Sequence, residues 1–95
     1  ADKISKRAYY KIRCKLIPSK YKLDIKYIKT EKEFIYSYQV FHEEPIVRWD
    51  NAPHYPDLPN YPHHFHEKNT VRDSDLNGDL LDDLKKVLNK ITNFL

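Results

Sequence analysis

Apolar and polar residues alternate along the first half of the chain. Between residues 8 and 17 every second residue is apolar, and the residues between them are mostly basic. The same period of two recurs over residues 20–29 and 33–42, and a shorter run covers residues 46–50. A period of two is typical of a strand with one buried face. Because the connections are short, we expect a four-stranded antiparallel meander.

Residues 79–94 follow a helical period instead. The apolar positions that recur at this spacing are Leu80, Leu84, Val87, Leu88, Ile91, Phe94 and Leu95. Aspartates come early in this segment and lysines come late, which suits the helix dipole. The apolar face of the sheet needs a cover, so we expect the helix to lie on it. The sequence thus predicts a single α+β domain over residues 1–95.

Residues 51–66 connect the fourth strand with the helix and are rich in histidine and proline. Pro53, Pro56, Pro59 and Pro62 recur at every third residue, the spacing of polyproline II. Proline fixes the backbone φ, so we expect an ordered loop without regular secondary structure. The sequence does not decide whether residues 69–72 form a short fifth strand.

Charge is unevenly distributed along the chain. Residues 1–36 carry eleven Lys and Arg against four Asp and Glu, whereas residues 37–95 carry six against ten. A basic half on a small domain suits a polyanion or an acidic partner. The candidate substrate-binding residues share the polar side of the first two strands and are Lys11, Arg13, Lys15 and Lys22. A solvated lysine-rich surface explains the same pattern.

Other compositional features exclude several classes of protein. The chain has no apolar run long enough to span a membrane and no apolar core of a signal peptide. Cys14 is the single cysteine, so neither an internal disulfide nor a cysteine-based metal site can form. We therefore expect a cytoplasmic protein with no membrane partner.

Four of the five histidines, His54, His63, His64 and His66, lie in the proline-rich segment. Imidazole titrates near neutral pH, so two histidines can act as general base and general acid. RNA suits this chemistry because its 2′-hydroxyl supplies the nucleophile. We expect His64 and His66 to be the acid–base pair, in a scheme that needs no metal.

Two alternatives for the histidines remain open. His64 and His66 alternate as on a strand, so both can face one metal ion. His54 or Asp50 would then complete the coordination sphere of that ion. The histidines can also be structural, with hydrogen bonds inside a proline-rich turn.

The segment before the loop, RWDNAP, carries further candidates. Arg48 and Asp50 are two residues apart on a predicted strand, so they share a face and can pair or bind a ligand jointly. In the acid–base scheme Arg48 stabilises the phosphorane charge, and Asp50 or His54 orients a neighbouring histidine. Trp49 points the other way, into the core with Val47.

A calcium-loop pattern occurs near the C-terminus. Asp73, Asp75, Asn77 and Gly78 match the opening of an EF-hand loop. The twelfth position should be glutamate but is Leu84. An ordinary helix start with an N-cap explains these residues better.

The stretch VRWDNAPHYPDLPNYPHHFH, which follows the tyrosine-rich FIYSYQVF, resembles the TumE-type toxin family. The family pattern is roughly R-[WY]-D-N-A-P-H-H-P, then a spacer and F-P-H-H-x-H. The matching residues run from Arg48 to His54, then Pro56, then Pro62 to His64, and His66. The chain departs at Tyr55, where a second histidine is common, and at Tyr61, where phenylalanine is common.

The resemblance implies a toxin restrained by a helix-turn-helix antitoxin of the TumA type. Together with the residues, it leads us to expect a toxin that acts on RNA as a metal-independent ribonuclease. The alternatives are a non-enzymatic inhibitor or binding module, and a metal-dependent nuclease that uses the histidine cluster.

Overall fold

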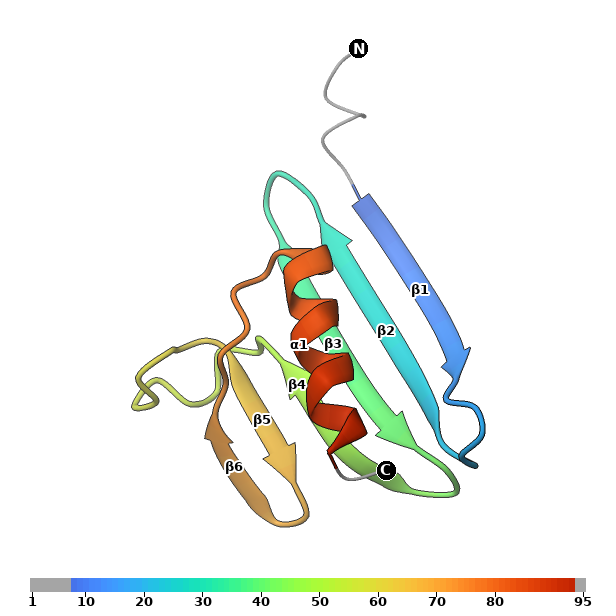
Figure 1. The fold of residues 1–95 in the computed structure, drawn as a ribbon. Helices are drawn as coiled ribbons and strands as arrows, with labels where there is room; N and C mark the ends of the chain where they lie inside the picture. The colour runs from blue at the N-terminus through green and yellow to red at the C-terminus, as the bar shows by residue number, and fades with distance from the viewer. Residues whose placement is uncertain (1–7, 94–95) are drawn as a thin grey trace.

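The computed structural model describes residues 8–93, which form one antiparallel sheet and one helix. The elements are β1 (Ala8–Lys15), β2 (Lys22–Lys29), β3 (Phe34–Phe41), β4 (Pro45–Asp50), β5 (His64–Glu67), β6 (Thr70–Asp73) and α1 (Leu80–Thr92). The strands lie in chain order, and each is antiparallel to the next. Figure 1 shows α1 across one face of the sheet. The α+β class is therefore confirmed.

The sheet has six strands where four were expected. The first four lie close to their predicted positions, but His64–Glu67, expected in the loop, is a strand that pairs with β4. The sixth strand falls on the stretch left open near residues 69–72. Each of these two strands has only four residues, too few for a clear period of two. Pairing of β5 with β4, and of β6 with β5, decides their conformation.

The remaining loop, residues 51–63, is a series of turns. The Leu58 amide donates to the Tyr55 carbonyl at 3.2 Å, and the Tyr61 amide donates to the Leu58 carbonyl at 3.1 Å. A polyproline II helix has no internal hydrogen bonds. The prolines therefore lie in turns and not in a polyproline II helix, and residues 51–63 contain no helix or strand, as expected.

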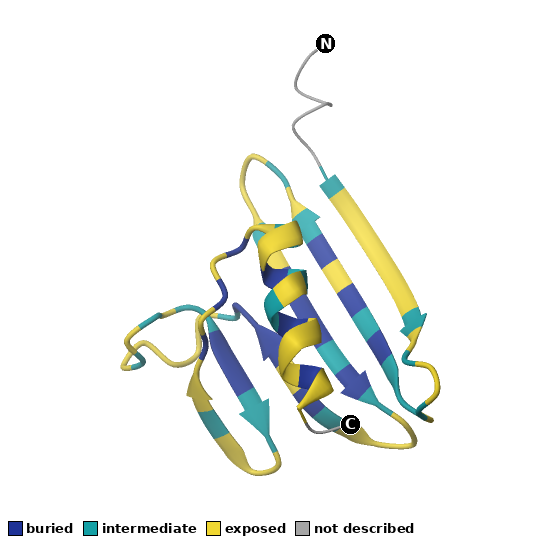
Figure 2. Ribbon diagram, viewed as in Figure 1, coloured by how far each residue is buried: buried dark blue, intermediate teal, exposed yellow. Residues whose placement is uncertain are grey.

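The core lies between α1 and the face of the sheet that it covers. Its buried apolar residues are Leu23, Ile25, Tyr27, Tyr36, Tyr38, Val40, Val47, Trp49, Phe65, Leu76, Val87 and Ile91. Figure 2 shows buried positions that alternate with intermediate or exposed ones along β2. In β3 three consecutive residues, Tyr36 to Tyr38, are buried. Val47 and Trp49 point into this core as predicted, which leaves Arg48 and Asp50 on the opposite, open face.

Some apolar positions expected on the covered face remain exposed. Tyr10 and Ile12 of β1 are 46% and 44% exposed, and Leu88 of α1 is 41% exposed. A helix is about 10 Å wide, whereas strands are spaced by about 4.8 Å, so one helix covers only the central strands. β1 lies at the sheet edge, beyond its reach (Figure 2). Phe94 and Leu95, also expected in the core, lie outside the described residues.

The calcium-like segment is the start of α1, as expected. Asp79 is the N-cap and accepts a hydrogen bond from the Asp82 amide. The fully buried Asp83 carboxylate accepts the amides of Asn77 and Gly78 at 2.9 and 2.8 Å. These donors satisfy the carboxylate inside the turn, so the segment is a helix cap. Among residues 8–93, no helix has the length and apolar character needed to cross a membrane.

Candidate functional site

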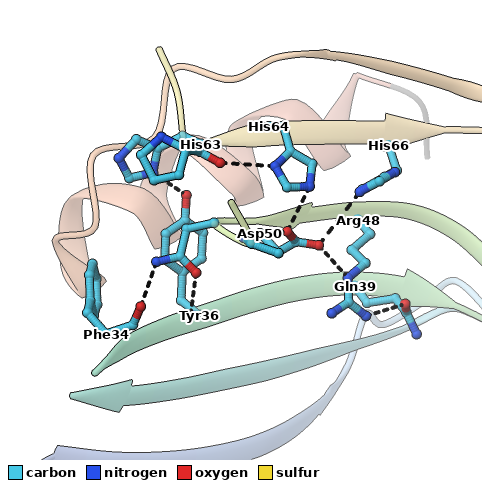
Figure 3. A network of polar contacts seen from close by, with 11 residues as sticks. Phe34, Tyr36, Gln39, Arg48, Asp50, His63, His64 and His66 are labelled. Carbon is cyan, nitrogen blue, oxygen red and sulfur yellow. Dashed lines mark hydrogen bonds and ion pairs between the residues drawn. The ribbon is translucent and has the colours of Figure 1, made fainter. Parts of the chain in front are cut away.

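A polar cluster occupies the open face of β4 and β5. Asp50 is the register partner of His64, and Arg48 is the register partner of His66. Alternation along both strands places these four side chains on the face that α1 leaves open. Figure 3 shows them converging on the Asp50 carboxylate. The predicted joint placement of Arg48 and Asp50 is confirmed.

Asp50 is the centre of the cluster and is buried, with 7% of its surface exposed. Its Oδ1 accepts the Ala52 amide at 3.0 Å and lies 2.8 Å from Nε2 of His64. Its Oδ2 accepts a hydrogen bond from Nε of Arg48 at 2.8 Å. This carboxylate therefore has a partner on each oxygen and a fixed orientation.

His64 is held at both ring nitrogens. The ring is 1% exposed, and Nδ1 lies 3.0 Å from the Pro62 carbonyl, which can only accept. Nδ1 therefore carries a hydrogen. Nε2 faces Oδ1 of the Asp50 carboxylate at 2.8 Å. His64 is consequently shielded from solvent and fixes Asp50.

His66 is the accessible histidine of the cluster, with its side chain 32% exposed. Its Nε2 lies 3.7 Å from Oδ2 of Asp50, too far for a hydrogen bond. Burial lowers its pKa, and the positive charges of His64 and Arg48 act in the same direction, whereas Asp50 opposes them. His66 is thus neutral near pH 7 with an available ring nitrogen.

The other two loop histidines lie apart from this cluster. His63 places Nδ1 2.6 Å from the Tyr36 hydroxyl and stacks on the Tyr36 ring. Burial lowers the pKa of His63 and raises that of Tyr36, so both are neutral and the hydroxyl donates to Nδ1. His54 is exposed on the loop and contacts the edge of Tyr55.

Tyr55 is a site residue that the sequence did not single out. Its ring packs edge-on against His64 and His66, with centroid distances of 4.9 and 6.0 Å. The signal for it was the departure from the family pattern, which often has histidine at this position. Tyr55 therefore covers the two histidines where a second imidazole was expected.

The expected basic residues lie on the same open face, at the other end of the sheet. Lys11 is the register partner of Lys26, and Lys15 is the register partner of Lys22. Arg13, between them, forms a two-bond ion pair with Asp24, which lowers the pKa of that carboxyl. Lys26 was not among the predicted binding residues, although it alternates with Lys22.

Two hollows connect this basic region with the histidines. The larger, of about 280 Å³, runs from Lys11 and Lys26 to Gln39 and Arg48. The smaller, of about 160 Å³, is lined by Gln39, Arg48 and His66 among others. Because both share Gln39 and Arg48, the open face forms a continuous shallow surface from β1 to His66.

Asp50, His64 and His66 also have the geometry of metal ligands. One donor atom from each lies within 4.8 Å of the others. His54, considered as a third ligand from the sequence, is not part of this group.

A family model described as Toxin TumE matches residues 2–95. The chain belongs to the TumE toxin family. Among curated proteins none matches the chain, and the same holds for solved structures. Membership over nearly the whole chain confirms the resemblance that the Arg48–His66 motif indicated. A TumE toxin implies a cognate antitoxin. The four residues of the Asp50 cluster all belong to the Arg48–His66 motif.

Proposed function

We propose that this toxin acts on RNA as a ribonuclease whose active centre is Arg48, Asp50, His64 and His66. The placement of this centre and a basic surface on one uncovered face of the sheet supports the proposal. RNA bound along β1 and β2 would extend over Gln39 to His66.

The pairing of lysines across β1 and β2 is the observation that carries the RNA-binding part. Like charges directly opposite each other destabilise a sheet. Lys11–Lys26 and Lys15–Lys22 are two such pairs on one face. A bound phosphate backbone neutralises lysines and releases counterions, which offsets this repulsion. The pairs are therefore better suited to a polyanion than to an unliganded surface.

In the proposed reaction, Nε2 of His66 takes the proton of a ribose 2′-hydroxyl. The 2′-oxygen attacks phosphorus and the bond to the 5′-oxygen breaks, which leaves a 2′,3′-cyclic phosphate. Water protonates the departing 5′-oxygen, and the resulting hydroxide takes the proton held by His66. Arg48 stabilises the added charge on the phosphorane. The buried His64–Asp50 pair positions Arg48 and His66, so the two histidines have different roles.

A non-enzymatic inhibitor or binding module is the second candidate. The observation that favours it is that His63 and His64 are both hydrogen-bonded and shielded, as structural histidines are. In that case the open basic face alone would bind the target.

The test is incubation of the purified chain with mixed RNA, with and without EDTA, beside His66→Gln and His54→Gln variants. We expect cleavage that persists in EDTA, yields 2′,3′-cyclic ends, and is lost in His66→Gln but kept in His54→Gln. RNA binding without cleavage by folded protein, together with toxicity retained in His66→Gln, would support the binding module instead.

A further inference from the structure

We infer that Asp50, His64 and His66 form a binding site for a divalent first-row transition-metal ion such as Zn²⁺. The inference has two parts. Ion binding stands on the geometry alone, whereas its effect on RNA cleavage rests on the proposed function.

The distances between the donor atoms fit a shared ion. An ion bound to nitrogen and oxygen at about 2.0–2.2 Å in a tetrahedral arrangement separates its ligand atoms by about 3.3 Å. Nε2 of His64 lies 2.8 Å from Oδ1 of Asp50, and Nε2 of His66 lies 3.7 Å from Oδ2. One donor atom of each of the three residues lies within 4.8 Å of the others. Small side-chain shifts therefore suffice to enclose an ion.

The contacts of His64 and Asp50 match the outer shell of a metal site. A metal-bound histidine usually donates its other N–H to a carbonyl or carboxylate, which fixes the ring. Nδ1 of His64 does so to the Pro62 carbonyl at 3.0 Å. The Ala52 amide fixes Asp50 in turn. Nε2 of His64 and Oδ1 of Asp50 face each other at 2.8 Å, so a small separation of the two side chains admits an ion between them.

The donor set selects the kind of ion. Two imidazoles and one carboxylate suit Zn²⁺, Co²⁺ or Ni²⁺, whereas Mg²⁺ and Ca²⁺ prefer oxygen ligands. The three residues lie on paired strands, so the backbone holds them at fixed separations. His66 is partly exposed while His64 and Asp50 are buried, which leaves a solvent-facing position for a fourth ligand. Arg48, bonded to Oδ2 of Asp50, opposes the positive charge of the ion and limits its affinity.

An ion at this position would regulate the proposed reaction. It would occupy Nε2 of His66, the atom that is proposed to take the proton from the 2′-hydroxyl. Added Zn²⁺ should therefore inhibit RNA cleavage, and EDTA should restore it.

The experiment is a titration of the metal-free purified chain with Co²⁺, followed by visible absorption, and with Zn²⁺, followed by calorimetry. We expect one ion per chain, displacement of Co²⁺ by Zn²⁺, and no comparable binding of Mg²⁺. His66→Gln should weaken Zn²⁺ binding by more than the roughly 10–100-fold that loss of an outer-shell partner costs. His54→Gln, the same substitution on an exposed histidine, should leave binding unchanged. His66 is chosen over His64 because its removal spares the buried pair.

The outcomes separate the two proposals. No stoichiometric binding, or equal loss in His54→Gln and His66→Gln, would overturn the metal site even if the chain cleaves RNA. Stoichiometric, His66-dependent binding by a chain that never cleaves RNA would support the site and overturn the proposed function. Cleavage that requires Zn²⁺ would support the site and overturn both the metal-free mechanism and the inhibitory role.

Discussion

Nε2 of His64 lies 2.8 Å from Oδ1 of Asp50, which joins two strands that flank the proline-rich loop. Both side chains are buried, so removal of the His64 ring leaves a cavity and takes one partner from Oδ1 of Asp50, which keeps the Ala52 amide. We expect His64→Ala to lower the free energy of unfolding by about 3 kcal/mol. Urea unfolding measures this, with the exposed His54→Ala as the control. Equal midpoints for the two variants would show that the contact does not stabilise the fold.

Arg48 binds Asp50 through Nε, a contact that lysine cannot reproduce in the same geometry. Arg48→Lys keeps the charge, so RNA affinity should be nearly unchanged while the cleavage rate falls about a hundredfold. Arg72→Lys is the matched control, since Arg72 is an exposed arginine on β6 that pairs with Glu67. A rate drop of the same size in both variants would argue against a specific role for Arg48.

The lysine pairs of β1 and β2 predict opposite effects on stability and binding. In Lys11→Gln the repulsion from Lys26 is removed, so the unfolding free energy should rise by about 0.2–1 kcal/mol. RNA binding should weaken, and the slope of log affinity against log salt should lose about 0.7 for the missing phosphate contact. Thermal unfolding and binding at several salt concentrations measure the two quantities.

Lys85→Gln, on the exposed surface of α1, is the control for this charge change. It should alter neither the salt slope nor the affinity. If both substitutions weaken RNA binding equally, net charge governs RNA affinity, and the open face is not a specific RNA-binding surface.

Gly78 has φ +95°, and a Cβ there would meet the Phe34 ring at 2.6 Å. Both the backbone conformation and the contact disfavour a side chain. Gly78→Ala should therefore lower stability by about 1–3 kcal/mol. Thermal unfolding beside Leu81→Ala, at a position 72% exposed on α1, measures the effect. Unchanged unfolding of Gly78→Ala would mean that the turn can open away from Phe34.

Asp24 should make a small, pH-dependent contribution to stability. The hydrogen bonds from Arg13 lower its pKa in the folded state below the unfolded value. A lowered carboxyl pKa stabilises the fold above the unfolded pKa, and this stabilisation is lost as pH falls through the folded pKa. The difference in unfolding temperature between wild type and Asp24→Asn should therefore be largest near neutral pH and shrink in acid. A difference that grows in acid would contradict this.

The sequence by itself determined the parts of this protein that rest on long periodic patterns. Alternation over eight residues is enough to assign β1 to β3, because each position repeats the same choice of face. The shorter alternation in β4 still gave the orientation of Trp49. The helical period fixed α1, and the Arg48–His66 motif identified the family. The position of a strand or helix, and the face on which each side chain lies, depend mainly on neighbouring residues. Local sequence patterns therefore predict them.

Only the tertiary structure decided how the histidines are used. The sequence singles out His64 and His66 by their alternation, but it does not distinguish these two histidines from each other. Pairing of β5 with β4 buries His64 against Asp50 and leaves His66 open to solvent, while His63 turns to Tyr36. That pairing brings together residues from the two sides of a loop. β5 has only four residues, so its sequence pattern alone does not predict the pairing. Burial and partner choice arise from such contacts between distant segments, and those contacts gave the four histidines different environments.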